Sequence, residues 1–272
     1  MPDTGLAVGL AFFDLFESFQ SLLLMTALTT IRIYAAMTVL PATSESVLPG
    51  MTRGALACVV AGFIAFGQPM ADVMQLGAGT LLMLALKELM LGVLIGFSAA
   101  TVFWVAESVG ALVDTQTGYN SVQMSNPMSG EQSTPVSALL LQFCVVIFYM
   151  LGGMLVFLGA LLESFKVWPL MSALPSMANA AEVFVVQQAD TLMTVTIKFA
   201  APVLLILLLI DLGVGLVTRV ADKLEPATIG QPLKAAVGML VVALMISVFA
   251  AQVQQFLLPT DVMQRLHQLL PG

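Results

Sequence analysis

Charged residues are scarce in this chain. Of its 272 residues, 9 are Lys or Arg and 16 are Asp or Glu, which together make up 9%. A soluble domain carries about 25% charged residues, because polar side chains must cover its core. The formal net charge of −7 also disfavours a surface that binds the phosphates of a nucleic acid. These shortages exclude a soluble enzyme, a disordered chain and a nucleic-acid-binding protein.

Histidine and cysteine are almost absent. His267 is the single histidine, so neither a histidine-based catalytic triad nor a histidine-rich metal cluster can be built. Cys58 and Cys144 both lie in apolar runs, which favours small packing residues over a disulfide or a metal site. A glycine-rich phosphate-binding loop of standard spacing is also missing. We therefore expect no enzymatic activity, no cofactor and no metal.

Apolar residues dominate instead, at 59% of the chain. A helix needs about 20 apolar residues to cross about 30 Å of hydrocarbon. Six long apolar segments meet or approach this length, and none alternates with the period of two that is typical of a membrane barrel. They are Ser21–Leu40, Ala55–Ala71, Leu76–Ala106, Val136–Leu162, Val183–Thr218 and Ala235–Leu258. The sequence therefore predicts an all-α, polytopic membrane protein.

A few charged residues interrupt these apolar segments. Lys87 and Glu88 lie in the middle of the third segment, and Lys198 lies in the fifth. An ionisable group at the centre of a bilayer costs about 2.5–3.5 kcal/mol on insertion scales. Such groups line a polar passage, pair with a partner subunit, or lie at an interface if the segment boundaries are shifted. Pro202, four residues after Lys198, is expected to bend its helix.

Small residues recur at a spacing of four in the third segment, at Gly92, Gly96 and Ala100. Such a stripe permits close contact between helices. Glycine is also common in membrane helices without such a role, so the spacing alone leaves both interpretations open.

The longest polar stretch between apolar segments is Glu107–Pro135. Glu107, Gly110 and Asp114 share one helical face, and the glycine of Gly118-Tyr119-Asn120 is expected to end that helix. Thr134-Pro135 is typical of an N-cap followed by proline at the first helical position. The stretch lies in water outside the membrane, or it folds inward and blocks a central passage.

Three stretches resemble the T component of the type III secretion export apparatus, the SctT/FliR family. They are VGALVDTQTG at 109–118, continuing to Asn126-Pro127; FLGALLESF at 157–165 with Trp168-Pro169-Leu170; and DLGVGLVTR at 211–219, followed by IGQPL at 229–233. Their order and spacing fit nearly the whole chain. The stretch SGEQS at 129–133 is more similar to the virulence, or injectisome, branch than to the flagellar branch.

The resemblance implies a fold, partners and a location. Residues 1–182 would form an R-like unit of bent helical hairpins, with a plug loop at about 106–135. Residues 183–272 would form an S-like hairpin followed by a short C-terminal helix. One T subunit would join about five R and four S subunits, the U switch protein and the V export protein. This gate would lie in the bacterial inner membrane, partly in the periplasmic plane of the basal body, and pass unfolded polypeptides.

The resemblance assigns the plug residues, whereas the positions of the charges and the distribution of Lys and Arg among the loops assign the other roles. The residues expected in the plug or lining the passage are Gly110, Asp114, Gln116, Gly118, Tyr119 and Met124. Those expected to be buried or to contact other subunits are Lys87, Glu88, Lys198 and Pro202. A basic cytoplasmic turn would hold Arg219, Lys223 and Lys234. The alternative function is a secondary transporter of small solutes, with Lys87, Glu88 and Lys198 as a buried coupling site.

Overall fold

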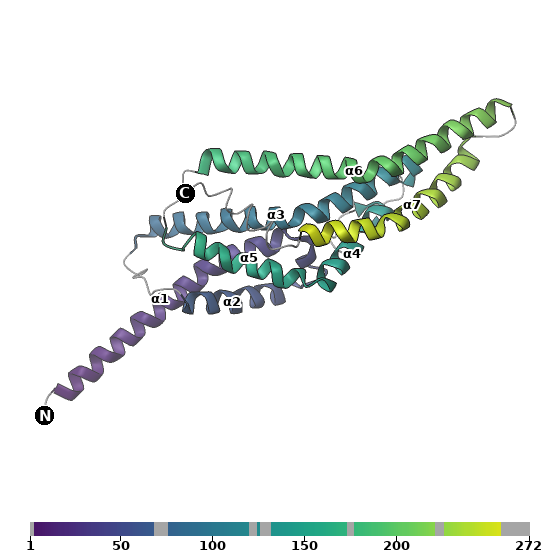
Figure 1. Cartoon of the computed structure of the whole chain (residues 1–272). Coiled ribbons are helices and arrows are strands. Elements are labelled where there is room, and N and C mark those ends of the chain that lie inside the picture. Colours follow the sequence, from purple (N-terminus) through teal and green to yellow (C-terminus); the bar gives the residue numbers. More distant parts are fainter. Residues whose placement is uncertain are drawn as a thin grey trace. The chain divides into compact units, whose positions relative to one another are not determined.

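The computed structural model describes residues 3–67, 76–119, 124–125, 132–172, 177–220 and 226–256 (Figure 1). These residues are helical except for connections and one two-residue antiparallel ladder, in which Met124 lies opposite Ser133. The elements are α1 (Asp3–Val39), the 3-10 helix η1 (Pro41–Thr43), α2 (Gly50–Phe66), α3 (Ala78–Thr117), β1 (Met124–Ser125), β2 (Gln132–Ser133), α4 (Pro135–Met150), α5 (Gly153–Val167), α6 (Met177–Val220) and α7 (Pro226–Phe256). The predicted all-α class is confirmed.

The number of single helices that are long and apolar enough to cross a membrane is smaller than the six apolar segments of the sequence. Among the described residues, three are long and apolar enough: α1 over Leu15–Val39, α3 over its whole length, and α6 over Val186–Arg219. The bent pair α4 and α5 gives a fourth span if it is counted as one. The apolar parts of α2 and α7 are shorter. The six apolar segments thus lie on helices, but not as six equivalent spans.

The fourth apolar segment, Val136–Leu162, is divided between two helices. Helices α4 and α5 meet at an angle of 72°. Gly152 has a φ of +74°, which favours glycine, and it follows the C-cap residue Leu151. A Cβ on Gly153 would lie 2.5 Å from Cε2 of Phe148, so this position also excludes a side chain. The Gly152-Gly153 pair therefore produces the bend.

Helix α3 extends beyond the end of the third apolar segment, Leu76–Ala106. Its 40 residues span about 60 Å, which is about twice the thickness of the hydrocarbon. Residues 107–117 of the stretch assigned to the plug are therefore helical, as the shared face of Glu107, Gly110 and Asp114 predicted, and their role in a plug stays a prediction. Gly118 ends the helix with a φ of +83°, as its sequence predicted.

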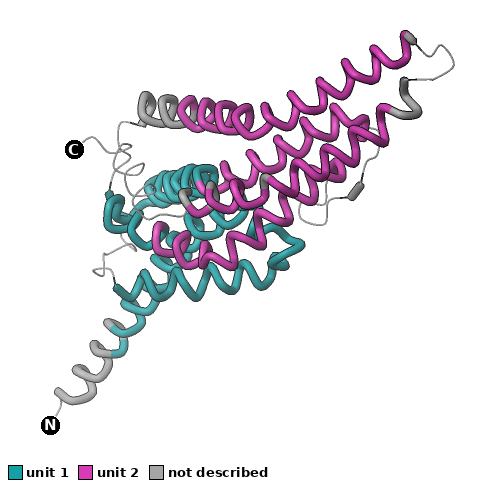
Figure 2. Tube along the Cα trace, turned by 45° about the vertical axis from the view of Figure 1, so that its right-hand side comes forward, with its two compact units in different colours: residues 1–98, 161–175 teal, residues 99–160, 176–272 magenta. Residues whose placement is uncertain are grey.

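The chain divides into two compact units (Figure 2). Unit 1 comprises residues 1–98 and 161–175, and unit 2 comprises residues 99–160 and 176–272. The chain passes from one unit to the other inside α3 and again inside α5. These units are defined by which residues pack together. The expected boundary between residues 182 and 183 instead separates R-like from S-like sequence, and it stays a prediction. The expected short C-terminal helix lies outside the described residues.

In unit 1, α3 packs closely on α1 through two glycines. A Cβ on Gly96 would lie 2.6 Å from the carbonyl oxygen of Ala36, and one on Gly92 would lie 2.8 Å from Cβ of Ala35. Real Cβ atoms do not approach other atoms this closely, so only glycine permits the contact. Of the two interpretations that the spacing of Gly92 and Gly96 left open, the structure shows the close helix contact.

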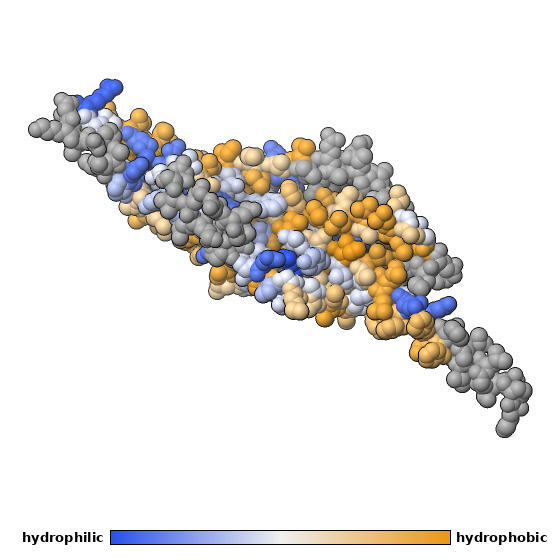
Figure 3. Space-filling model, turned by 180° about the vertical axis from the view of Figure 1, so that it is seen from behind, coloured by the Kyte–Doolittle hydropathy of each residue, from blue (hydrophilic) through white to orange (hydrophobic). Residues whose placement is uncertain are grey.

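In unit 2, α4 packs on α7, and α6 and α7 form a hairpin. The ring of Phe103 on α3 meets that of Phe148 on α4 edge to face, with centroids 5.4 Å apart. Phe199 and Phe249 pair across the hairpin at 4.7 Å. Many large apolar side chains on several helices remain exposed, and they cover much of the face seen in Figure 3. Surfaces of this kind contact lipid or other proteins.

Candidate functional site

A buried junction joins the end of α3 to the start of α4 in unit 2. Asp114 on α3 is 0% exposed, and its Oδ2 accepts hydrogen bonds from the backbone N–H groups of Val136 (3.0 Å) and Ser137 (3.1 Å). Thr134 is the N-cap residue of α4, as predicted, but its hydroxyl makes no capping bond. Asp114 therefore caps α4 in its place, from a helix that ends 18 residues earlier.

The charge of Asp114 is balanced by the helix that it caps. The first N–H groups of a helix have no partner within the helix, and the aligned peptide dipoles place partial positive charge there. Within the described residues Asp114 forms no ion pair, and its Oδ1 has no hydrogen-bond partner. The N-terminus of α4 is thus the principal compensation for this carboxylate in that part of the chain.

The face predicted from Glu107, Gly110 and Asp114 is the face that meets α4. A Cβ on Gly110 would lie 2.6 Å from the backbone nitrogen of Ser137, so α3 and α4 touch through their main chains. The hydroxyl of Ser137 donates to the carbonyl oxygen of Glu107 at 3.0 Å. These contacts lock the polar end of α3 onto the first turn of α4.

The same end of α3 also meets α7. A Cβ on Gly118 would lie 3.1 Å from Nε2 of Gln231, and one on Gly238 would lie 3.3 Å from Cγ2 of Thr117. Two of the stretches that carried the family resemblance, 109–118 and 229–233, therefore lie side by side. Of the other residues expected in the plug, Gln116 and Tyr119 are half-buried. Met124 lies in β1, and its side chain is outside the described residues.

A buried cluster of charges occupies unit 1. Arg32 on α1 binds Glu88 on α3 through two parallel bonds, Nε to Oε2 at 2.6 Å and Nη2 to Oε1 at 2.9 Å. Lys87 adds an ion pair to Oε1 of Glu88 at 3.1 Å. Arg32 and Glu88 are 0% exposed and Lys87 is 2% exposed. The paired fork of an arginine with a carboxylate is the strong form of such contacts.

The cluster carries one positive charge in excess, and the end of α5 compensates it. Nζ of Lys87 donates to the carbonyl oxygens of Pro169 (3.1 Å), Leu170 (2.6 Å) and Ser172 (3.2 Å). Arg32 donates from Nη2 to the carbonyl oxygen of Trp168 at 3.1 Å. Carbonyl groups past the C-terminus of a helix attract cations. The cluster thereby anchors residues 168–172 to α1 and α3.

The sequence left three alternatives for Lys87 and Glu88: lining a polar passage, pairing with a partner subunit, or lying at an interface. The structure shows none of these but pairing within the chain. Arg32, which sequence reasoning left without a role, is the central partner, and its guanidinium also lies 3.8 Å from the centroid of the Phe165 ring. Its position inside the first apolar segment was the available signal. Both oxygens of Glu88 already accept bonds, which leaves this carboxylate unsuited to hold a transported ion.

The remaining predicted residues lie on the α6–α7 hairpin. Lys198 and Pro202 are both exposed on α6, which changes direction in this region in both views of the trace (Figures 1 and 2). Arg219 is exposed near the end of α6, and Lys223 lies outside the described residues. Lys234 lies inside α7, not in a turn, and pairs with Asp211 on α6 at 2.9 Å. The connection between these helices is therefore shorter than predicted.

The sequence is similar to those of several known proteins. A family model described as "Bacterial export proteins, family 1" matches residues 23–259. Yop proteins translocation protein T of Yersinia pestis is 31% identical over 226 residues, which cover 83% of this chain and 87% of that protein. The surface presentation of antigens protein SpaR of Salmonella typhimurium is 25% identical over 237 residues, or 87% of this chain and 88% of that protein.

A flagellar relative is also similar. The flagellar biosynthetic protein FliR of Escherichia coli is 24% identical over 221 residues, which cover 81% of this chain and 83% of that protein. The higher identity to the Yersinia protein agrees with the branch favoured by residues 129–133. The match to the family model begins within α1 and extends through α7, and it includes the residues that build the two buried sites. The chain belongs to the bacterial export proteins, family 1, the SctT/FliR family of type III secretion export apparatus components.

Proposed function

We propose that the chain is the T subunit of the type III secretion export gate in the bacterial inner membrane. It forms, with R and S subunits, the passage by which unfolded secreted proteins enter the secretion channel. The end of α3 and the connection that follows it supply the plug that closes this passage at rest. The proposal includes no catalytic step, so energy for transport comes from other components.

The observation that carries the proposal is the junction at Asp114. A segment that closes a passage must be held at its base while its middle gives way. The end of α3 is held on α4 by the Asp114 cap and on α7 by the contact of Gly118 with Gln231. The ladder of β1 with β2 brings the two ends of the 124–133 connection together. Both features support a plug that is anchored at its base.

The partners follow from the family as an expectation. About five R and four S subunits would surround one T subunit, with the U switch protein and the V export protein nearby. The large exposed apolar surface of the helices supports contact with sister subunits and with lipid. The rival function, a small-solute transporter, receives no support from Lys87 and Glu88, because both residues already have partners within the chain: Glu88 pairs with Arg32 and Lys87, and Lys87 also donates to three carbonyl oxygens.

We predict that Asp114→Ala raises ion leakage through the inner membrane of cells that hold the assembled apparatus. Loss of an N-cap costs about 0.5–2 kcal/mol, which weakens the base of the plug without unfolding the helices. The expected result is leakage several times that of the unaltered protein, measured as conductance or as ion-dependent growth inhibition. The substitution tests the plug more specifically than a deletion of residues 109–123 would, because the deletion would also remove the contacts of α3 with α4 and α7.

Two variants control this measurement. Asp114→Asn keeps an oxygen that accepts the two N–H bonds, so it is expected to leak less than Asp114→Ala. Thr115→Ala changes an exposed neighbour on the same helix and is expected to leave leakage unchanged. If Asp114→Ala assembles into the apparatus in normal amount and does not leak, the end of α3 is not the base of a plug.

A further inference from the structure

Helix α6 is much less covered by the rest of the chain than the other two long helices. Only 17% of the residues in its apolar window are buried, compared with 44% for α1 and 56% for α3. Its buried side holds Gln188, Phe199, Val203 and Leu207 and faces the remainder of unit 2. The opposite side of α6 is therefore left for lipid or for another protein.

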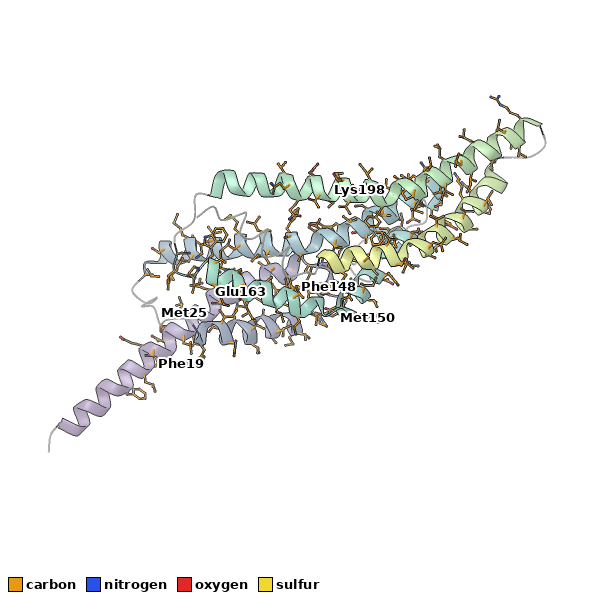
Figure 4. All side chains as sticks on the ribbon, in the orientation of Figure 1. Phe19, Met25, Phe148, Met150, Glu163 and Lys198 are labelled. Atoms are coloured by element: carbon orange, nitrogen blue, oxygen red, sulfur yellow. The ribbon has the colours of Figure 1, made fainter. Side chains whose placement is uncertain are left out.

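The open side consists mainly of large apolar residues. We call it the Lys198 face and define it by Met193, Ile197, Lys198, Leu205 and Leu209. Lys198 is labelled on α6 in Figure 4. Each of its four apolar members is more than half exposed. Such a face fits either the hydrocarbon of a membrane or the apolar side of a partner helix.

The charge of Lys198 favours a protein partner over lipid on this face. Within the described residues Lys198 forms no ion pair, and the nearest acid that precedes it on α6, Asp190, is eight residues and thus about 12 Å away along the helix. The next acid along α6, Asp211, already pairs with Lys234. An unpaired ammonium group among apolar side chains at membrane depth is unfavourable in lipid, and such groups face protein or water instead.

We propose that the Lys198 face binds an apolar helix of a different membrane protein, which places an Asp or Glu carboxylate opposite Lys198. This inference rests on the proposed function, because the partner is a subunit of the same apparatus. The carboxylate pairs with Lys198 as Glu88 pairs with Arg32 and Lys87 inside unit 1. The apolar residues around Lys198 exclude water from the pair and so strengthen the attraction.

A second copy of this chain does not fit the same face in a symmetric pair. Two copies inserted in one membrane have the same orientation, so a twofold axis between them runs along the membrane normal. Such an axis sets equivalent residues of the two helices against one another. Lys198 would then oppose Lys198, and like charges in contact repel. A symmetric pair of this chain is therefore disfavoured, and the proposal commits to a partner of different sequence.

Photo-crosslinking identifies what covers the face. A photoreactive amino acid is placed at Ile197, and at Met51 on α2 as an exposed control, in the full apparatus within native membranes. The proposal expects the Ile197 product to contain a helix of another apparatus subunit that bears an acidic residue at the crosslinked depth. Crosslinks only to lipid, to a second copy of this chain or to secreted polypeptide would overturn it.

Charge exchange then tests the pair itself. Lys198→Glu is expected to reduce recovery of the assembled apparatus at least tenfold, and Lys198→Arg to leave it nearly unchanged. Changing the acidic residue of the crosslinked helix to Lys should restore assembly of Lys198→Glu. Lys166→Glu is the matched control, because Lys166 is exposed and pairs within its own helix α5. Normal assembly of Lys198→Glu, or no rescue by the reciprocal change, refutes the proposal.

Failure of this inference is distinguishable from failure of the proposed function. Leakage of Asp114→Ala reports on closure of the passage and does not depend on Lys198. If Asp114→Ala leaks while Lys198→Glu assembles normally, the gate function stands and the Lys198 face binds no carboxylate. If Asp114→Ala does not leak while charge exchange succeeds, the subunit contact stands and the plug proposal is wrong.

Discussion

Glu88→Ala is expected to prevent recovery of the folded protein from membranes. The substitution leaves Arg32 and Lys87 buried with no carboxylate to neutralise them, although both remain beside the carbonyl groups that follow α5. Removing one partner of a buried ion pair costs about 3–5 kcal/mol, because the remaining charge stays out of water. The measurement is the amount of protease-resistant protein in the membrane, together with the midpoint of its thermal unfolding in mild detergent.

A second ion pair offers the matched control for Glu88→Ala. Glu163 and Lys166 on α5 also form an ion pair, but their side chains are 35% and 71% exposed. Exposed pairs contribute about 0–1 kcal/mol, so Glu163→Ala should unfold close to the midpoint of the unaltered protein. Equal midpoints for Glu88→Ala and Glu163→Ala would show that the buried cluster does not hold unit 1 together.

The double variant Arg32→Met with Glu88→Met separates charge imbalance from lost packing. Replacing both members of a buried pair by apolar residues of similar size is often neutral or stabilising. The double variant leaves only Lys87, whose ammonium group keeps three carbonyl partners. We therefore expect it to recover part of the folded protein lost in Glu88→Ala. A double variant that is no more stable than Glu88→Ala would mean that the bonds of Arg32 themselves are essential.

The pairing of Arg32 with Glu88 could in part be foreseen. Glu88, Gly92 and Gly96 are spaced by four, so the acid lies on the same face of α3 as the small residues that permit a close helix contact. Sequence could not show which helix fills that face, because Arg32 is 56 residues away and any apolar segment could have supplied the partner. Once α1 packs on the glycines, a buried acid next to them requires a cation from α1, and Arg32 is the residue within reach.

Two parts of the junction between α3 and α4 were predicted separately from the sequence. The shared face of Glu107, Gly110 and Asp114 and the N-cap position at Thr134 both follow from spacing and residue type, and both are confirmed. The bond between the two pieces was not predictable, because a threonine at the N-cap ordinarily caps with its own hydroxyl. Tertiary packing brought a charged acceptor to the same N–H groups, and the charged acceptor forms the stronger bond.

Hydropathy alone did not predict where the helices end. Hydropathy ended the third segment at Ala106, whereas α3 continues for eleven polar and apolar residues because they bury one face on α4 and α7. Hydropathy also did not reveal the bend between α4 and α5, because glycine counts as apolar and no charged residue lies at the break. In both cases the deciding factor was backbone geometry: Gly118 at the true end of α3, and Gly152 at the break.

Gly110→Val is expected to abolish secretion and to lower the stability of unit 2. Its branched side chain would enter the space of the Ser137 backbone, where even a single Cβ lies too close, and a main chain cannot move aside as a flexible side chain can. Overpacking of this kind costs about 1–3 kcal/mol, and the upper part of that range applies here because α4 must lift from α3 and release the Asp114 cap. Gly159→Val on α5 is the control, since a Cβ there meets nothing within 4 Å. Secretion assays and thermal unfolding of the purified complex should separate the two variants, and a Gly110→Val protein that secretes and unfolds like Gly159→Val would contradict the close contact of α3 with α4.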